Sequence, residues 1–357
     1  MINRLKTTFA NKRIFITGHT GFKGTWMLAV LNYLGNNEVM GYALAADDGS
    51  MYNAIDGDSL CHSIIADIRD ADRLTEEISR FQPDYIIHLA AQALVIDAYQ
   101  FPAYTWDVNV MGTVNVMNAI KLSGHNCYAV LVTTDKVYEN KEWYYPYREN
   151  DTLGGHDPYA SSKAAAELAV SSFRRSFFPI HEYAKHQQAI ASARAGNVIG
   201  GGDWSANRLV PDIARALLSE GSVVVRNPNS VRPWQHVLEP VCAYLLLASQ
   251  LGQDPKLHSQ AYNIGPNQED VLSVEELVNK CLMAWGGGTY TNLPNASAVH
   301  EANLLQLDIS LAKNLLNWQP KWNSAKAIEM TIDWYKNHLN QQFALTLAQV
   351  DEYLSSE

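Results

Sequence analysis

The chain is short of basic residues. Its 357 residues include 27 lysines and arginines against 37 aspartates and glutamates, which gives a formal net charge of −10. No basic stripe runs along the sequence, so this balance excludes a protein that binds nucleic acid through its bulk charge. A single anionic nucleotide is still compatible with the charge, because a helix N-terminus or one arginine binds phosphate locally.

Cysteines and long apolar runs are scarce as well. The four cysteines lie far apart, at positions 61, 127, 242 and 281, without a CxxC pair or a metal-ligand spacing. We therefore expect reduced thiols, with neither a disulfide framework nor a metal site. No apolar run reaches the length of a membrane span, and residues 1–11 lack the apolar region of a signal peptide. These absences predict a cytoplasmic protein without a membrane partner.

What the chain does have is a regular alternation of strand-like and helix-like segments. Hydrophobic residues make up 47% of the sequence, enough for a large core. Helical spacing of apolar residues predicts helices at 22–34 and 106–122, and a longer one at 324–340 before a polar tail. The alternation predicts an α/β fold with a Rossmann-type, doubly wound parallel sheet. The expected strands are at 13–17, 38–43, 84–89, 128–133 and 189–194.

A glycine-rich turn follows the first predicted strand. Gly18, Gly21 and Gly24 lie in GHTGFKG, between that strand and the first helix. In a dinucleotide-binding turn the first glycine permits the tight bend, the second lets the backbone approach a pyrophosphate, and the third packs the helix on the sheet. An ordinary glycine-rich strand-to-helix turn is the alternative, and the context favours the cofactor site.

The adenosine side of this site is less clearly marked. Residues 41–46 carry no acid for the ribose hydroxyls and no arginine for a 2′-phosphate, which favours NAD over NADP. Asp67 and Ile68 follow a short apolar run and are candidates for contact with the adenine edge. The alternative for Asp67 is an ordinary aspartate at the end of a strand.

Tyr159 and Lys163 form a Y-x-x-x-K pair. Residues four apart share one helix face, so the phenol and the ammonium are predicted to point at one site. A nearby ammonium lowers the pKa of a tyrosine, which then accepts the proton of a sugar hydroxyl while hydride leaves for a nicotinamide. Thr134, just past the strand at 128–133, would add a hydroxyl at the same edge of the sheet. A surface helix pair is the alternative for Tyr159 and Lys163.

Several segments resemble the extended short-chain dehydrogenase/reductase family, and the resemblance runs from about residue 12 to 322. They are GHTGFKG at 18–24, HLAAQ at 88–92, NVMGT at 109–113 and RAGNVIGGGDW at 194–204. The resemblance implies a tightly held nicotinamide cofactor, NAD, and a nucleotide-sugar substrate. It assigns the cofactor to Gly18, Thr20, Gly21, Phe22, Lys23, Gly24, Asp67, Ile68, Leu89, Ala90, Ala91, Asn109, Thr133, Tyr159 and Lys163.

The resemblance also implies a division of the chain into two domains. We expect an NAD-binding Rossmann domain at 1–195, with returning segments near 237–265. A smaller, mostly C-terminal substrate-binding domain would then comprise 196–236 and 266–357. Family members are usually dimers, and the helices at 109–122 and 161–174 are the candidates for a homodimer interface.

The segment TTDKVYEN at 133–140 resembles the 4,6-dehydratases of the family. An acid directly after the catalytic threonine suits loss of water across C5 and C6, and epimerases usually lack it. Asp135 would be that acid and must be protonated, which requires a raised pKa. The Asp135-Lys136 pair resembles the CDP-glucose 4,6-dehydratases, so CDP-glucose is the favoured substrate. Lys136 would be the base at C5 or stabilise the enolate; a salt bridge near the cofactor is the alternative.

Substrate contacts are likewise implied by the resemblance. A guanidinium group can form paired hydrogen bonds with a pyrophosphate. The resemblance assigns this role to the arginine in VRPWQH at 231–236, Arg232. Residues 96–98 read Ile-Asp-Ala, whereas the CDP-glucose 4,6-dehydratases that the chain resembles have an arginine and a serine in this segment. This difference bears on which sugar or nucleotide the protein accepts. The residues assigned to the substrate are Gln92, Asn197, Arg208, Arg232 and His300.

Three alternatives stay open from the sequence. One is a sugar-nucleotide epimerase, and another is a dehydratase of a different nucleotide sugar. The third is a catalytically silent sensor or scaffold on the same fold, which fold alone does not exclude. If the dehydratase interpretation holds, the product is a 4-keto-6-deoxy sugar nucleotide, which the resemblance connects with deoxysugar and lipopolysaccharide O-antigen synthesis.

Overall fold

A parallel sheet organises the structure, a computed structural model that describes residues 1–36, 38–225, 227–293, 304–339 and 341–356. Its strands are β1 (Ile14–Thr17), β2 (Val39–Ala43), β3 (His62–Ile65), β4 (Tyr85–His88), β5 (Cys127–Thr134), β6 (Gln188–Ala195) and β11 (Ala261–Ile264). They lie in the order β11-β6-β5-β4-β1-β2-β3, and all neighbours pair in parallel. The predicted α/β fold with a doubly wound parallel sheet is confirmed.

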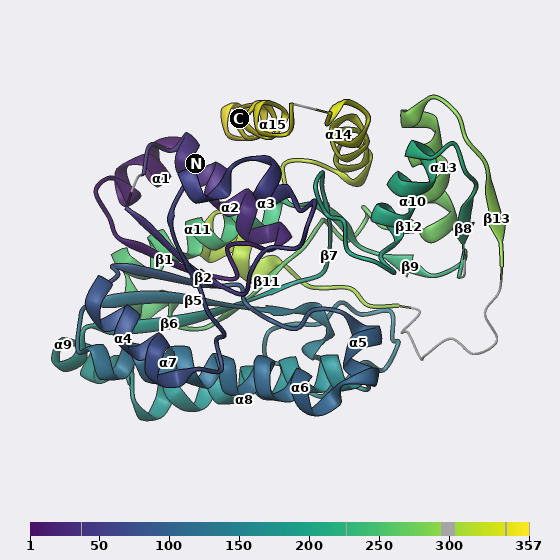
Figure 1. The fold of residues 1–357 in the computed structure, drawn as a ribbon. Helices are drawn as coiled ribbons and strands as arrows, with labels where there is room; N and C mark the ends of the chain where they lie inside the picture. Colours follow the sequence, from purple (N-terminus) through teal and green to yellow (C-terminus); the bar gives the residue numbers. More distant parts are fainter. Residues whose placement is uncertain (37, 226, 294–303, 340, 357) are drawn as a thin grey trace.

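Helices cover both faces of this sheet (Figure 1). Alternate side chains of β1 pack into two different hydrophobic clusters. Ile14 and Ile16 belong to the first cluster, and Phe15 belongs to the second. A strand buried on both faces needs such an unbroken apolar run. The first cluster includes α2 (Phe22–Tyr33) and α11 (Leu238–Gln253). The second includes α4 (Ala71–Phe81), α7 (Gly112–Ser123) and α8 (Pro158–Ser176).

The chain reverses its direction of travel across the sheet at β1. From β1 it proceeds outward through β2 and β3, then returns to β4 on the other side and proceeds through β5 and β6 to β11. In open α/β sheets, ligands bind beyond the carboxyl ends of the strands at such a switch point. Thr17, His88 and Thr134 end β1, β4 and β5, so these positions face the expected site.

A smaller group of elements lies beside the sheet, at the right of Figure 1. Two short pairings join β8 with β13 and β9 with β12, and β7 pairs with β10 where the chain enters this group. Its elements are β7 (Asn197–Ile199), α10 (Leu209–Leu218), β8 (Val223–Val225), β9 (Val231–Arg232), β10 (Trp234–His236), β12 (Leu272–Ser273), α13 (Val274–Trp285) and β13 (Tyr290–Asn292).

The C-terminal prediction was wrong in one respect. After α14 (Ser324–Asn337) there is no polar tail but another helix, α15 (Gln342–Ser355). Val350, Tyr353 and Leu354 of α15 are buried, because they share the helix face that packs on the body of the protein. Figure 1 shows α15 lying above α2, with α14 beside it.

The predicted helix at 106–122 is interrupted. The structure has α6 (Pro102–Trp106), one π-helical turn η2 (Asp107–Met111) and then α7. Single π turns are frequent at functional sites. The remaining elements are α1 (Ile2–Phe9), α3 (Met51–Ala54), η1 (Gly57–Ser59), α5 (Val95–Gln100), η3 (Asp135–Val137), η4 (Ile180–Glu182), α9 (Tyr183–His186), α12 (Pro255–His258) and η5 (Ala312–Leu316). Within the described ranges, no helix is long and apolar enough to cross a bilayer.

Candidate active site

The glycine turn has the geometry of a phosphate cradle. Gly18 has φ of +77°, and a Cβ there would lie 2.8 Å from the backbone nitrogen of Ala90. A Cβ on Gly24 would lie 2.1 Å from the Gly18 oxygen, so both positions require glycine. A Cβ on Gly21 would meet only the Gly18 oxygen, at 3.5 Å. The packing of the protein does not demand Gly21, and the space beside it suits a pyrophosphate at the N-terminus of α2.

Two buried residues that the sequence argument did not single out hold this turn against β4. Thr17 Oγ1 accepts a hydrogen bond from the Ala90 N–H at 3.2 Å and lies 2.7 Å from Nδ1 of His88. His88 Nε2 lies 2.9 Å from the Thr113 hydroxyl, and burial lowers the pKa of His88 to about 3. A neutral histidine therefore bridges β1 and α7. The HLAAQ motif carried this signal, and the predicted residues Leu89, Ala90 and Ala91 line the same strand end.

Asp67 and Ile68 lie just beyond the end of β3. The carboxylate of Asp67 accepts hydrogen bonds from Arg69, whose Nη2 is 2.7 Å from Oδ2. The side chain of Ile68 is buried, and a Cβ on Gly112 would lie 2.8 Å from its Cγ2. Among the described residues, the Ile68 N–H has no hydrogen-bond acceptor. An anionic acceptor and a free donor therefore lie side by side at this strand end.

Thr134, Asp135 and Lys136 form one tight turn where β5 ends. The Thr134 hydroxyl donates to Oδ1 of Asp135 at 3.0 Å, and its oxygen accepts from the Lys136 N–H at 3.4 Å. Only 3% of Asp135 is exposed, and a Cβ on Gly196 would lie 2.7 Å from its Oδ2. Burial raises the pKa of Asp135, while Lys136 and Thr134 lower it less strongly. The direction of this shift is the one predicted for an acid.

Tyr159 and Lys163 occupy the first turns of α8, which Asp157 caps at the N-terminus. The predicted lowering of the Tyr159 pKa was wrong for this structure: burial raises that pKa to about 12, and Thr134 and Arg208 oppose it. The Lys163 ammonium instead donates to the backbone oxygen of Val132 at 2.9 Å, and burial lowers its pKa to about 8.

A buried ion pair lies beneath this helix, and the sequence argument missed it. Glu167 and Arg194 are 3.0 Å apart, with side chains 1% and 4% exposed. Glu167 also accepts hydrogen bonds from the hydroxyls of Thr133, at 2.6 Å, and Ser192, at 2.9 Å. Burying both charges is tolerated only when close pairing and additional hydrogen bonds of this kind compensate for the lost hydration. The predicted cofactor residue Thr133 thereby ties α8 to β5, one residue before Thr134.

Asn109 and Gln92 form hydrogen bonds with each other. Asn109 accepts from the Gln92 N–H at 2.9 Å and donates to the Gln92 oxygen at 3.0 Å and to the Ser162 hydroxyl at 2.9 Å. The Gln92 amide bonds Leu94 and Thr105. The π turn of η2 thus places Asn109 as a brace between the β4 loop and α8, close to Tyr159.

Three cationic side chains act on Asp135, and a fourth, Arg208, acts on two of its neighbours. Lys136, Arg232 and Lys23 each lower its pKa, and Arg208 acts on Lys23 and Tyr159. Burial and the neighbouring cations lower the pKa of Lys23 to about 8. This positive field suits a ligand with a diphosphate, whose charge would compensate the cations.

The other predicted residues lie on several different elements of the fold. Arg208 pairs with the buried Asp203 at 3.0 Å, Arg232 ends β9 and Asn197 begins β7. Thr20 donates to the Leu44 oxygen at 3.0 Å, and Phe22 opens α2. His300 lies outside the described residues. Among the residues that the structure describes, no group of histidine, cysteine, aspartate or glutamate side chains has an arrangement suited to a metal ion.

Comparison with known proteins identifies the family. The family model described as GDP-mannose 4,6 dehydratase matches residues 15–331. Over 354 residues the chain is 41% identical to CDP-glucose 4,6-dehydratase of Salmonella typhimurium, with 98% of each chain covered. These findings confirm the resemblance to the sugar-nucleotide dehydratases that the sequence motifs indicated.

Solved structures show the same fold. The dTDP-glucose 4,6-dehydratase DesIV of Streptomyces venezuelae, with NAD bound, has a TM-score of 0.78 at 23% identity, covering 93% of this chain and 99% of that one. A UDP-glucose 4-epimerase of Thermotoga maritima has a TM-score of 0.76 at 21% identity, covering 92% and 99%. With its Rossmann-type sheet and the match to the family model, this chain belongs to the GDP-mannose 4,6 dehydratase family.

Proposed function

We propose that the chain is an NAD-dependent dehydratase that converts CDP-glucose to CDP-4-keto-6-deoxyglucose. The observation that carries this proposal is the turn at the end of β5, where a buried Asp135 with a raised pKa follows Thr134 and precedes Lys136. An acid and a cation at this position suit the loss of water better than a simple inversion at C4. The relative from Salmonella typhimurium, a CDP-glucose 4,6-dehydratase, supports the choice of substrate.

NAD fits the residues present. The space beside Gly21 suits its pyrophosphate, the acceptor of Asp67 and the donor of Ile68 suit its adenine edge, and Lys163 would hold the nicotinamide ribose. The described part of the loop after β2 provides no arginine for a 2′-phosphate. When bound, NAD would supply a hydride acceptor for C4 of the sugar and a hydride donor for C6. The protein residues must therefore manage only the protons and the binding.

Tyr159 is the base for the first oxidation. Its phenolic oxygen takes the proton from the C4 hydroxyl, and the Thr134 hydroxyl stabilises the phenolate through the hydrogen bond that lowers the Tyr159 pKa. The Lys163 ammonium, one turn further along α8, is held by the Val132 oxygen. A bound cationic nicotinamide and the sugar hydroxyl would add to these effects on the tyrosine.

Asp135 and Lys136 divide the elimination between them. Oxidation at C4 makes the C5 proton acidic, and Lys136 removes it or stabilises the enolate. Asp135, whose pKa is raised by burial, gives its proton to the C6 hydroxyl, which leaves as water. Return of a proton to C5, together with the hydride that the cofactor would supply to C6, would give a product that has lost one water.

The substrate diphosphate would bind between the sheet and the smaller group of elements. Arg232 of β9 and Arg208 at the start of α10 supply two guanidinium groups there, and Asn197 of β7 supplies an amide. This arrangement supports the proposed division into a cofactor domain at 1–195, with a return near 237–265, and a substrate domain at 196–236 and 266–357. Gln92 keeps a supporting role through its bonds to Leu94.

We also propose a homodimer through α7 and α8. Large apolar side chains are exposed on these two helices and on the residues next to them in the chain: Trp106, Met111, Leu122, Leu168 and Phe177. Such a patch is typical of an interface. Sedimentation of the purified protein should give twice the chain mass, and Leu168→Glu should shift it to one chain mass.

We further propose that the enzyme is cytoplasmic and that its product is used to make deoxysugars for lipopolysaccharide O-antigen.

Incubation with CDP-glucose, in parallel with dTDP-, UDP- and GDP-sugars, tests the main proposal. The expected result is a product one water lighter from CDP-glucose, carrying solvent deuterium at C5 when the reaction runs in heavy water. Loss of water only from another nucleotide sugar would overturn the substrate, and the loop at 96–98 would then be the first place to look. An isomer of unchanged mass would overturn the reaction in favour of an epimerase.

A further inference from the structure

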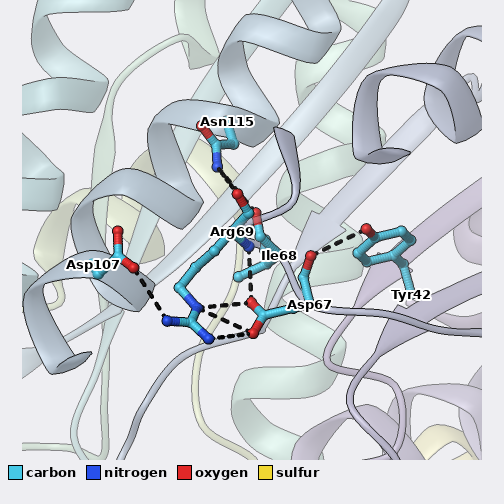
Figure 2. A network of polar contacts seen from close by, with 6 residues as sticks. All are labelled: Tyr42, Asp67, Ile68, Arg69, Asp107 and Asn115. Carbon is cyan, nitrogen blue, oxygen red and sulfur yellow. Dashed lines mark hydrogen bonds and ion pairs between the residues drawn. The ribbon is translucent and has the colours of Figure 1, made fainter. Parts of the chain in front are cut away.

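We propose that Arg69 is a positioning residue for the adenine half of the cofactor site, an inference that rests on the proposed NAD dependence. Arg69 lies two residues after Asp67 in the loop between β3 and α4. Its guanidinium lies between two carboxylates, Asp67 and Asp107 (Figure 2). This arginine has no part in the glycine turn or in the catalytic turn.

Arg69 fixes the orientation of the Asp67 carboxylate. Its Nε is 3.1 Å from both Oδ1 and Oδ2, and its Nη2 is 2.7 Å from Oδ2. Its own backbone N–H adds a bond to Oδ1 at 2.9 Å. Paired donors of this kind fix both the position and the plane of a carboxylate. An aspartate at the end of a strand would otherwise sample several rotamers.

The guanidinium is itself held from its far side. Nη1 of Arg69 is 3.2 Å from Oδ2 of Asp107, the first residue of η2. The ring of Tyr104 lies beneath the guanidinium, 4.8 Å from Cζ to the ring centroid. Arg69 therefore joins the strand-end loop to η2 and α6, and it cannot swing away without losing these contacts as well.

The backbone of the loop is anchored independently. Asn115 of α7 donates to the Ile68 oxygen at 3.1 Å, and the Tyr42 hydroxyl donates to the Asp67 oxygen at 3.1 Å (Figure 2). These bonds fix where Asp67 and Ile68 lie. They do not fix the direction of the Asp67 side chain, which leaves that task to Arg69.

This arrangement leaves one acceptor beside one donor. A carboxylate has about four lone-pair sites, and the three N–H groups of Arg69 occupy most of them. Because Nε is shared between both carboxylate oxygens, one acceptor site is left on Asp67, and the free N–H of the next residue along the chain, Ile68, is the donor nearest to it in sequence. Adenine presents an amino donor next to the N1 acceptor and matches this pair. Hypoxanthine presents a carbonyl next to an N–H and mismatches both.

Comparison of NAD with nicotinamide hypoxanthine dinucleotide tests the proposal. Calorimetric titration of the full-length protein should give at least about 10-fold tighter binding of NAD, because a charged hydrogen bond contributes about 1.5–3 kcal/mol. In Arg69→Met the ratio between the two dinucleotides should fall to about 3-fold or less. Arg69→Lys retains the charge without the fork, and should give an intermediate ratio.

The ratio separates positioning from a general loss of structure, since a merely destabilised pocket weakens both dinucleotides alike. Arg80→Met, on the exposed face of α4, is the matched control and should leave the ratio unchanged. A wild-type-like ratio in folded Arg69→Met would overturn the role of Arg69 and leave the dehydratase proposal intact. Equal affinities in the wild-type protein would overturn both the adenine assignment and the role of Arg69, while turnover of CDP-glucose would still be judged separately.

Discussion

The Thr134 hydroxyl donates a hydrogen bond to Oδ1 of Asp135 over 3.0 Å, and the same hydroxyl lowers the pKa of Tyr159. One side chain therefore contacts both the acid proposed for elimination and the base proposed for oxidation. Because a hydroxyl has a single proton, it serves one of these two oxygens at a time. This arrangement suits a reaction whose proton transfers occur in sequence.

Loss of the phenol should stop the first step. We expect Tyr159→Phe to reduce C4 oxidation by at least about 10²–10⁴-fold, the usual contribution of a positioned acid or base. Rapid-mixing measurement of NADH fluorescence with CDP-glucose reports this step directly. Tyr183→Phe, a half-buried tyrosine of α9, is the control and should react normally. Normal NADH formation in Tyr159→Phe would assign the base elsewhere.

Loss of the acid should separate oxidation from elimination. Asp135→Asn keeps the shape of the side chain and its bond to Thr134 but has no carboxylic proton to give. We expect C4 oxidation to continue while water loss slows by about 10²-fold or more, so that the reduced cofactor accumulates. A variant that makes product at the wild-type rate would remove Asp135 from the role of acid.

The role of Lys136 is open to an isotope test. If its amine removes the C5 proton, Lys136→Met should abolish exchange of that proton with heavy water, with a loss of about 10²-fold or more. C4 oxidation should continue, because the tyrosine and Lys163 are intact. Lys141→Met, five residues further along and half exposed, provides the control. Unchanged exchange in Lys136→Met would favour the salt-bridge alternative.

A buried glutamate outside the site should make stability depend on pH. Burial raises the pKa of Glu239 to about 7, against 4.5 in the unfolded chain. Since the folded state holds this proton more tightly, the contribution is fully present below pH 4.5 and is lost as the pH rises through 7. The loss amounts to about 3 kcal/mol.

Glu239→Gln should flatten this part of the profile and raise the free energy of unfolding above pH 7. Glutamine can still accept from the N–H groups of Lys321 and Trp322 and donate to the Tyr353 oxygen. Urea unfolding at several pH values measures the effect. Glu38→Gln, at an exposed position, should keep the wild-type profile. An undiminished slope in Glu239→Gln would assign the pH dependence to other groups.

The sequence predicted the elements whose signals are local. The strand at 128–133 and the helix at 22–34 appear almost as expected, because their own apolar residues determine how they are buried. The prediction of a polar tail after residue 340 was wrong. The segment is rich in polar residues, but as the helix α15 it has one apolar face, which packs against α2 and its neighbours. The strand β3 was missed because its half-exposed, four-residue run carries little pattern.

By itself, the sequence determined the residue types and their spacing along the chain: the glycine turn, the Y-x-x-x-K pair and the threonine, aspartate and lysine after β5. Only the tertiary structure decided their electrostatic state and their partners. Burial raises the pKa of Tyr159, whereas a neighbouring ammonium had been expected to lower it. Glu167 of α8 pairs with Arg194, which lies 27 residues away in the sequence. Desolvation and long-range pairing depend on what surrounds a group in space, and the order of residues along a chain does not contain that information locally.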